Sequence, residues 1–577
     1  MIKTATYCKR NLLFALMIIM AIFMALLFRI GYLMIFKADH YGIMAKQVQE
    51  RERVIKAARG IIYDRNGKVL ATNESVCTIS VINSQVTEPD RVIEVLSKKL
   101  AIDEEKIRKL VEKKSSMEKI KSNVDKKTAD EIRDCDLDGV MVDEDYKRVY
   151  PQGELASKVI GFTGSDNQGI VGLETKYDKY LKGTNGKIFT VTNAAGIRVD
   201  NKESTRQEAL KGYNLYTTID INIQKYAMQA AKKVYEQKSA KGVKIISMNP
   251  DNGEIYACVD YPEYDLNNPY KIQGKDEDEN GENGALNLDA LNEMWRNSCI
   301  SDTYEPGSTF KIITATAALE KGVVSLDETF NCVGYKVVED RKIRCHKTSG
   351  HGSETFVQAT GNSCNPVFME LGARVGAKDM YSCYRKLGLF STTGVDLPGE
   401  AGPIMHKLEN IGAVELATMS FGQSIQITPF ALLRSVSAVI NNGRLVTPHF
   451  GMYIEDDDKN VKKVIDNNQT TGVVLGDTCD KMKYILEKVV SEGGGSKGQV
   501  EGYRIGGKTA TSQKLPRGSG KYIASFIGFA PADAPKIITI VLIDEPQGVY
   551  YGGTIAAPVV ADIYSNILPY MDIECDK

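Results

Sequence analysis

The spacing of apolar residues changes several times along the chain, and the first change follows a basic flank that contains Lys9 and Arg10. An uncharged run covers residues 12–28, and apolar residues continue to Phe36. Crossing a bilayer takes roughly 20 such residues, and this run is longer than the apolar part of a signal peptide and lacks a small-residue cleavage site. We therefore expect a cytoplasmic tail and one transmembrane helix in residues 1–37, with the rest of the chain outside the cell membrane.

A more polar region with mixed patterns follows. Residues 59–82 read as strand, turn and strand around Asp64–Gly67, and Lys, Glu and Asp recur at helical spacing between about residues 88 and 143. Pro151 and repeated glycines then separate short apolar runs. These patterns predict a non-catalytic α+β pedestal over residues 38–212, which would hold the remaining chain away from the membrane.

Residues 213–577 have strand-like runs near both ends and helix-like spacing between them. The expected strands are 243–248, 254–259, 503–511, 523–529 and 537–543, and the first and last helices are 221–237 and 556–568. The polar run 274–284 has too little apolar content to fold and is expected to be a surface loop. This order predicts an α/β sandwich in which an antiparallel sheet is covered by helices.

Length and charge narrow the class of protein. A chain of 577 residues suggests roughly three or four units, and its net charge of −1 gives no sign of a nucleic-acid partner. The 11 cysteines are too scattered for the disulfide framework of a small secreted domain.

One short stretch has the residues of an activated nucleophile. In Tyr304–Lys311, Pro306 and Gly307 precede Ser308, and a helical pattern begins there. Residues three apart share a helix face, so Lys311 is expected beneath the Ser308 hydroxyl. A lysine in an apolar pocket loses its proton readily enough to act as a base, and the N–H groups of a helix N-terminus stabilise an oxyanion.

An S-x-x-K match is weak by itself, but two further motifs follow it. Ser363-Cys364-Asn365 and Lys508-Thr509-Ala510 both lie downstream of Ser308. S-x-x-K, an S-x-N-type motif and K-T-G form the motif set of penicillin-binding proteins and class A β-lactamases. A helix cap and an ordinary edge strand would explain the second and third motifs separately. Together, the three favour a serine acyl-transfer site.

Further segments extend the match to nearly the whole chain. They are Arg59-Gly60-Ile61-Ile62-Tyr63-Asp64-Arg65-Asn66-Gly67, Arg148-Val149-Tyr150-Pro151-Gln152-Gly153, Gly172-Leu173-Glu174 and Thr217-Thr218-Ile219-Asp220. With the three motifs, they resemble class B penicillin-binding proteins, and the likeness is nearest to the division and sporulation branch. The resemblance implies a monofunctional peptidoglycan D,D-transpeptidase with a penicillin-recognising serine transpeptidase domain in residues 213–577 and a dimerisation-like pedestal.

The resemblance also implies the catalytic roles. Ser308 would attack the penultimate D-Ala carbonyl of a stem peptide, and Lys311 would take its proton. Ser363 would relay that proton to the leaving D-Ala, while Asn365 would hydrogen-bond Lys311 and the donor amide.

Substrate binding is implied for the third motif and the residue after it. Lys508 would keep the site electropositive, Thr509 would bind the terminal carboxylate, and the Thr511 N–H would form an oxyanion hole with that of the nucleophile. Two positions depart from the family: Ala510 and Ser424 each stand where glycine is common. The methyl of Ala510 either points away from the substrate groove or narrows it.

The implied substrates are peptidoglycan stem peptides, the implied inhibitors are β-lactams, and acyl transfer of this kind requires no cofactor. A glycosyltransferase-like segment does not precede the pedestal, so we expect a membrane glycan polymerase as a partner, in septal or spore-cortex wall synthesis. Two other functions share the motifs: a β-lactam sensor that is acylated without turnover, and a D,D-carboxypeptidase that uses water as the acceptor.

Cysteine and histidine gather beside the second motif. Cys345, His351 and Cys364 lie within a short segment, and thiolate and imidazole are ligands that select zinc. A structural zinc site takes four ligands, and Asp302, which closely precedes the nucleophile, is expected as the fourth.

Other readings of this cluster stay open. Cys332 or His346 is an alternative to Asp302 as the fourth ligand. A disulfide between Cys345 and Cys364 is natural outside the membrane, and unpaired buried thiols are common core residues.

Overall fold

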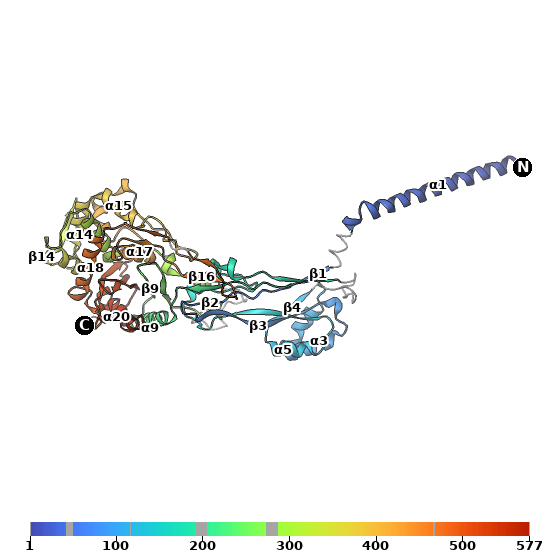
Figure 1. The fold of residues 1–577 in the computed structure, drawn as a ribbon, viewed down its shortest axis with the longest axis horizontal. Helices are drawn as coiled ribbons and strands as arrows, with labels where there is room; N and C mark the ends of the chain where they lie inside the picture. Colours follow the sequence, from blue (N-terminus) through green and yellow to red (C-terminus); the bar gives the residue numbers. More distant parts are fainter. Residues whose placement is uncertain are drawn as a thin grey trace. The chain divides into compact units, whose positions relative to one another are not determined.

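The computed structural model describes residues 2–41, 50–115, 117–191, 205–272, 287–465 and 468–575. The loop expected at 274–284 lies outside these ranges. The chain forms two compact units, whose elements are labelled in Figure 1. The smaller unit takes Met1–Ala58, Glu74–Lys147 and Thr184–Leu210, and the larger takes Arg59–Asn73, Arg148–Gly183 and Lys211–Lys577. Two segments that the sequence places in the pedestal therefore belong to the larger unit.

The smaller unit begins with helix α1 (Ile2–Ile35). Within it, Lys9–Ile35 is long and apolar enough to cross a membrane by length and composition, and its apolar window buries none of its surface against the protein. This helix fits the single span that the sequence predicts.

The rest of the smaller unit has a small α+β core. Strands β1 (Glu50–Ile55), β6 (Gly186–Val191) and β7 (Thr205–Gln207) form an antiparallel sheet in that order. Beside this sheet, the unit has an apolar cluster that contains the buried residues Ile79, Leu96 and Ile107. Its elements are α3 (Pro89–Leu100), α4 (Glu104–Val111), α5 (Lys126–Arg133), β4 (Glu118–Val124) and those parts of β3 (Val69–Val81) and β5 (Val140–Val149) that belong to this unit. Asp103 and Asp125 cap α4 and α5 with side-chain hydrogen bonds, as N-cap aspartates do.

A buried ion cluster explains why the segments that contain Arg59 and Arg148 pack in the larger unit. Arg59 Nε lies 2.6 Å from Glu174 Oε2, and Arg148 Nε lies 2.8 Å from Glu174 Oε1. Arg59 and Glu174 are 0% exposed, and Arg59 Nη1 also lies 2.7 Å from Asp178 Oδ1. A carboxylate that has left water needs paired donors of this kind. These charged residues are therefore part of the core.

The centre of the larger unit is a five-stranded antiparallel sheet in the order β10-β9-β21-β20-β19. Its strands are β9 (Gly242–Met248), β10 (Ile255–Tyr261), β19 (Gly506–Gln513), β20 (Tyr522–Ala530) and β21 (Ile537–Asp544). Strands from both ends of the domain thus share one sheet. This confirms the predicted fold class.

Helices cover both faces of this sheet, because successive residues along its strands belong in turn to two different apolar clusters. Val541 and Phe526 join helices α9 (Ile221–Lys238) and α20 (Ala557–Tyr570) in one cluster. Ile540 and Ile527 join Phe310 and the central helices in the other. Residues two apart on a strand share a face, so the alternation places one helical layer on each side.

The central helices are α12 (Lys311–Glu320), α13 (Phe356–Gly361), α14 (Asn365–Val375), α17 (Pro429–Ile440) and α18 (Gly476–Ser491). The other helices of the larger unit are α6 (Ser157–Ile160), α7 (Gly172–Lys176), α8 (Asp178–Leu181), α10 (Leu288–Trp295), α11 (Ser298–Ser301), α15 (Ala377–Lys386), α16 (Ala413–Met419) and α19 (Gly552–Ile555). The remaining strands are β2 (Ile62–Tyr63), β8 (Asn214–Thr217), β11 (Thr329–Cys332), β12 (Tyr335–Val338), β13 (Arg341–Arg344), β14 (Gly352–Thr355), β15 (Leu445–Val446), β16 (Gly451–Glu455), β17 (Val461–Val464) and β18 (Gln469–Thr470).

Candidate active site

Ser308 lies in a short 3-10 helix, Gly307–Phe310, that continues directly into α12. Ser308 is half-buried, whereas its neighbours Gly307 and Thr309 are buried. Gly307 has a φ of 57°, and a Cβ at this position would lie 2.3 Å from Ser512 Oγ. Glycine is therefore required before Ser308, both for the backbone conformation and for the close approach of Ser512.

Lys311 joins the first motif to the second. Its Nζ donates hydrogen bonds to the Ser363 carbonyl oxygen at 2.6 Å, to Asn365 Oδ1 at 2.7 Å and to Ser363 Oγ at 3.2 Å. The lysine is 0% exposed. Lys311 thus forms one hydrogen-bonded group with two residues of the second motif that lie more than fifty positions further along the chain.

The connection between α13 and α14 aims the second motif at this lysine. Ser363 has a φ of 55°, in the left-handed region that non-glycine residues rarely adopt. Such backbone costs roughly 1–2 kcal/mol and clusters at functional sites, where the surrounding structure holds it in place. The turn presents both Ser363 oxygens to Lys311, while Cys364 is buried on the other side.

The electrostatics favour loss of the Lys311 proton. Burial lowers the pKa of Lys311 to about 8, against the opposing negative charges of Cys345, Cys364 and Glu354. Burial and the charge of Lys311 also hold the pKa of Lys508 well below its usual value. A lysine with a lowered pKa is a competent base near neutral pH.

Strand β19 carries the third motif at the edge of the sheet. Lys508 is 0% exposed, and its Nζ donates to the Thr509 carbonyl oxygen at 3.2 Å. Thr509 and Thr511 are half-buried on the alternate side of the strand. Because the sheet ends at β19, the outer backbone edge has no strand partner in the described chain and suits an extended peptide.

The side chain of Ala510 faces the interior. It is 3% exposed, and its Cβ lies 3.6 Å from the position that a Cβ on Gly307 would take. The methyl group therefore packs toward the turn that carries Ser308. Of this residue, only the backbone is available to a ligand.

Glu305 and Arg517 complete the surroundings of the nucleophile and were not predicted. Glu305 Oε2 lies 2.6 Å from Arg517 Nη2, and Glu305 Oε1 accepts a hydrogen bond from the Ser424 N–H at 2.9 Å. Ser424 has a φ of 63°, so it occupies a backbone region that suits glycine. The position of Glu305 directly before Pro-Gly-Ser was a usable signal, but the sequence has none for Arg517.

Four side chains beside the second motif form a group that fits a metal ion. The ligand atoms of Cys332, Cys345, His351 and Cys364 all lie within 4.8 Å of one another. Their thiols are free. The hydrogen bond between Cys345 and Cys364 lowers the pKa of the Cys345 thiol and raises that of Cys364, so the two sulfur atoms share a proton in the absence of a metal. Three cysteine sulfurs and one imidazole are a common ligand set of structural zinc sites.

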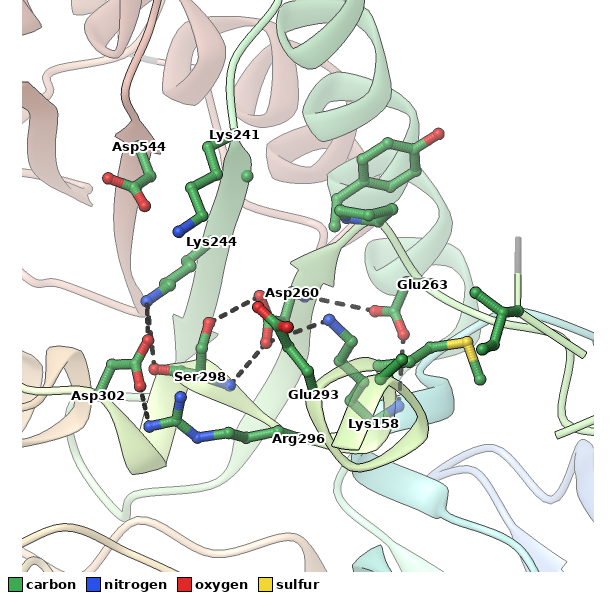
Figure 2. Close-up of a pocket in the computed structure, with 16 residues that line it drawn as sticks. Lys158, Lys241, Lys244, Asp260, Glu263, Glu293, Arg296, Ser298, Asp302 and Asp544 are labelled. Atoms are coloured by element: carbon green, nitrogen blue, oxygen red, sulfur yellow. Dashed lines mark hydrogen bonds and ion pairs between the residues drawn. The ribbon is translucent and has the colours of Figure 1, made fainter. Parts of the chain in front are cut away.

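The expectation that Asp302 is the fourth ligand is wrong. Its carboxylate lies 3.4 Å from Lys244 Nζ and also pairs with the guanidinium of Arg296 (Figure 2). Proximity to Ser308 along the chain did not bring Asp302 to the cysteines, and Cys332 from β11 takes the fourth position. His346 Nδ1 lies 3.8 Å from Cys345 Sγ but is not one of the four.

Comparison with known proteins gives the family. A model described as the penicillin binding protein transpeptidase domain matches residues 244–565, and one for the penicillin-binding protein dimerisation domain matches residues 54–217. The chain belongs to the penicillin-binding protein transpeptidase family, as its motifs predicted.

Relatives of known name match this chain over nearly its whole length. Stage V sporulation protein D of Bacillus subtilis (strain 168) is 37% identical over 99% of this chain and 87% of its own. Peptidoglycan D,D-transpeptidase FtsI of Escherichia coli (strain K12) is 28% identical over 96% of this chain and 90% of its own. Penicillin Binding Protein 2X from Streptococcus thermophilus, a crystal structure, superposes with a TM-score of 0.74 at 22% identity, over 91% of this chain and 80% of that one. The last comparison shows the shared fold.

Proposed function

We propose that the protein is a peptidoglycan D,D-transpeptidase that forms an acyl-enzyme on Ser308. The observation that carries the proposal is the buried Lys311, whose Nζ is held by Ser363 and Asn365 one helical turn after the nucleophile. This arrangement supplies a base and a proton relay next to the turn that carries Ser308.

In the proposed acylation, Ser308 Oγ attacks the carbonyl carbon of the penultimate D-Ala of a stem peptide. Its proton passes to neutral Lys311, and the new oxyanion accepts hydrogen bonds from the N–H groups of Ser308 and Thr511. The C–N bond then breaks, and the proton moves from Lys311 through Ser363 to the leaving D-Ala amine. Asn365 holds Lys311 and the donor amide in place.

Deacylation reverses the proton transfers with a different amine. The amine of a second stem peptide attacks the ester carbonyl, its proton returns through Lys311 to Ser308 Oγ, and a new amide cross-link remains. Lys508 keeps the site electropositive, and Thr509 binds the terminal carboxylate of the donor. The Lys508 side chain is buried on β19, where the negative charge of a bound donor carboxylate would favour its ammonium form.

We also propose where the protein works. Lys9–Ile35 anchors it in the cell membrane, and the catalytic unit lies outside, since basic residues precede the span. The two matched family models account for cross-linking and dimerisation. A membrane glycan polymerase that supplies the strands is therefore the proposed partner. The relative with a sporulation name and the FtsI relative support a role in spore-cortex or septal wall synthesis.

The cysteine group is proposed to hold a structural zinc ion, with Cys332, Cys345, His351 and Cys364 as ligands. Zinc bound there would fix the residue between Ser363 and Asn365 and so stiffen both hydrogen-bond partners of Lys311. We expect close to one zinc per chain in protein purified without added metal, and a lower melting temperature after chelation. Absence of zinc, or a Cys345–Cys364 disulfide in peptide maps, would contradict this assignment.

Mass spectrometry of the full-length protein with a donor peptide tests the catalytic proposal. We expect an acyl adduct on Ser308 and, with an amine acceptor present, a cross-linked product. Ser308→Ala should give neither. Hydrolysed donor without cross-linking would identify a D,D-carboxypeptidase, and a stable penicillin adduct without any peptide turnover would identify a β-lactam-binding sensor.

A further inference from the structure

The proposed function, on which this inference rests, requires the amine of the acceptor to reach Lys311. In deacylation the proton of that amine returns through Lys311, whose Nζ is held by Ser363 and Asn365. The donor of the acyl-enzyme lies along β19, on the strand that carries the third motif. The second stem peptide must therefore approach from the side of the second motif, where its amine meets the base.

A two-stranded hairpin begins at this side of the site. Its strands β12 and β13 are antiparallel and pair Tyr335 with Arg344 and Val338 with Arg341. The carbonyl oxygen of Arg344 accepts a hydrogen bond from Asn365 Nδ2 at 3.3 Å. The hairpin thus starts at the asparagine of the second motif, and each further residue along its strands lies about 3.3 Å farther from that contact.

One face of the hairpin anchors it to the protein. Successive side chains of a strand point to opposite sides, so Lys336, Val338 and Ile343 share a face. Val338 and Ile343 pack against an apolar cluster that contains Met369 of α14. Lys336 Nζ lies 3.2 Å from Glu370 Oε2 on the same helix. The contacts of this inner face fix the position of the hairpin beside the second motif.

The outer face is exposed and carries Tyr335, Val337, Lys342 and Arg344. Tyr335 and Val337 are 38% and 59% exposed. Lys342 Nζ lies 3.6 Å from the centroid of the Tyr335 ring, a cation–π contact that places its ammonium on this face. Neither Lys342 nor Arg344 has an ion pair with a carboxylate in the parts of the chain that the structure describes. Two such cations beside an exposed ring and a valine suit a ligand that has both carboxylates and apolar groups.

We propose that the outer face of this hairpin binds the acceptor stem peptide. Arg344 and Lys342 pair with carboxylates that the acceptor carries near its amine, and Tyr335 and Val337 contact its apolar groups. Binding there holds the amine close to Lys311 and so raises the rate of cross-linking relative to hydrolysis of the acyl-enzyme. The hairpin takes no part in the bond exchange, and its side chains act by positioning the acceptor.

The test compares two acceptors of different charge. The first is N-acetyl-L-Ala-γ-D-Glu-L-Lys, with one free amine and two carboxylates, and in the second both carboxylates are carboxamides. Full-length protein in detergent receives a donor peptide that ends in D-Ala-D-Ala, and kcat/KM for each acceptor is measured from the cross-linked product. The charged acceptor is expected to exceed the neutral one by about fivefold or more, the effect of one or two exposed ion pairs. The ratio should fall as salt is added, because salt screens exposed charges.

Variants place the preference on the outer face. Arg344→Gln and Lys342→Gln should each lower the ratio between the two acceptors by about twofold or more, and the double variant should bring it close to one. Arg341→Gln is the matched control, because it removes the same charge from the inner face of the same hairpin, and it should keep the wild-type ratio. All three side chains are exposed. Melting temperatures and fluorescent penicillin labelling establish that each variant is folded with a reactive Ser308.

The outcomes separate this inference from the proposed function. Equal kcat/KM for the two acceptors, a preference that survives the double variant, or an equal loss in Arg341→Gln would overturn the acceptor site while leaving transpeptidation intact. Hydrolysed donor without cross-linked product from either acceptor would overturn the proposed function, and the acceptor site with it.

Discussion

The Arg517 guanidinium lies 2.6 Å from the Glu305 carboxylate, and this contact joins the connection after β19 to the segment that leads into the Ser308 turn. Glu305 is 8% exposed and also accepts the Ser424 N–H, whereas Arg517 is half-exposed. The two side chains therefore contribute unequally to holding the segment before Ser308 in place, because an exposed charge is stabilised by water when its partner is lost.

We predict that Glu305→Gln slows benzylpenicillin acylation of Ser308 by about tenfold, which corresponds to roughly 1.4 kcal/mol. Arg517→Met should slow it by no more than about fivefold, as an exposed ion pair contributes up to about 1 kcal/mol. Stopped-flow acylation rates measure both effects. Lys481→Met, which breaks an exposed pair with Asp477, is the control. A larger effect for Arg517→Met than for Glu305→Gln would contradict the prediction that Glu305 contributes more than Arg517.

The lowered pKa of Lys311, about 8, predicts the pH dependence of acylation. Below this pKa the lysine is an ammonium and cannot accept the Ser308 proton, so the second-order rate constant should rise with pH and level off above about pH 8. Lys311→Arg stays protonated and should lose acylation at every pH. A rate constant that stays flat through neutral pH would exclude Lys311 as the base.

Ala510→Gly should not change drug selectivity. The methyl of Ala510 is buried toward Gly307, outside the groove, so acylation rates for small penicillins and for β-lactams with bulky side chains should change by the same factor. The variant should also be destabilised by about 0.5–1 kcal/mol, because glycine has more freedom in the unfolded chain. A selective gain for bulky drugs would show that the methyl borders the groove.

Glu174→Gln should destabilise the larger unit strongly. It leaves the buried guanidinium groups of Arg59 and Arg148 without their shared carboxylate, and breaking a buried ion pair costs about 3–5 kcal/mol. Urea unfolding followed by the fluorescence of Trp295, the one tryptophan of the sequence, reports on this unit. Glu492→Gln, at an exposed pair with Lys488 in the same unit, is the matched control and should change stability by less than about 1 kcal/mol. Similar losses in both variants would contradict the core role of Glu174.

The sequence predicted what depends on local geometry. The three-residue spacing of Ser308 and Lys311 is read directly from helical periodicity. The antiparallel sheet followed from strands at both ends of the domain. Motif order brought Ser363 and Asn365 into the same hypothesis.

Contacts across the chain escaped prediction. Asp302 was assigned to zinc because it closely precedes Ser308, yet the chain turns between them and Asp302 pairs with Lys244 instead. Arg59 and Arg148 lie in segments that look like a polar pedestal, since charge normally marks the surface. Their burial depends on Glu174, a partner that spacing alone cannot reveal.

The exposed edge of β19 has a consequence for solubility. A strand edge that stays unpaired to receive a substrate is equally open to any other extended chain, including another copy of this protein. Lys514 and Arg517 follow the strand, but each is already paired with a carboxylate, Lys514 with Asp544 and Arg517 with Glu305. Charge at this end of the strand therefore gives little protection against edge-to-edge pairing, and self-association should compete with donor binding at high protein concentration.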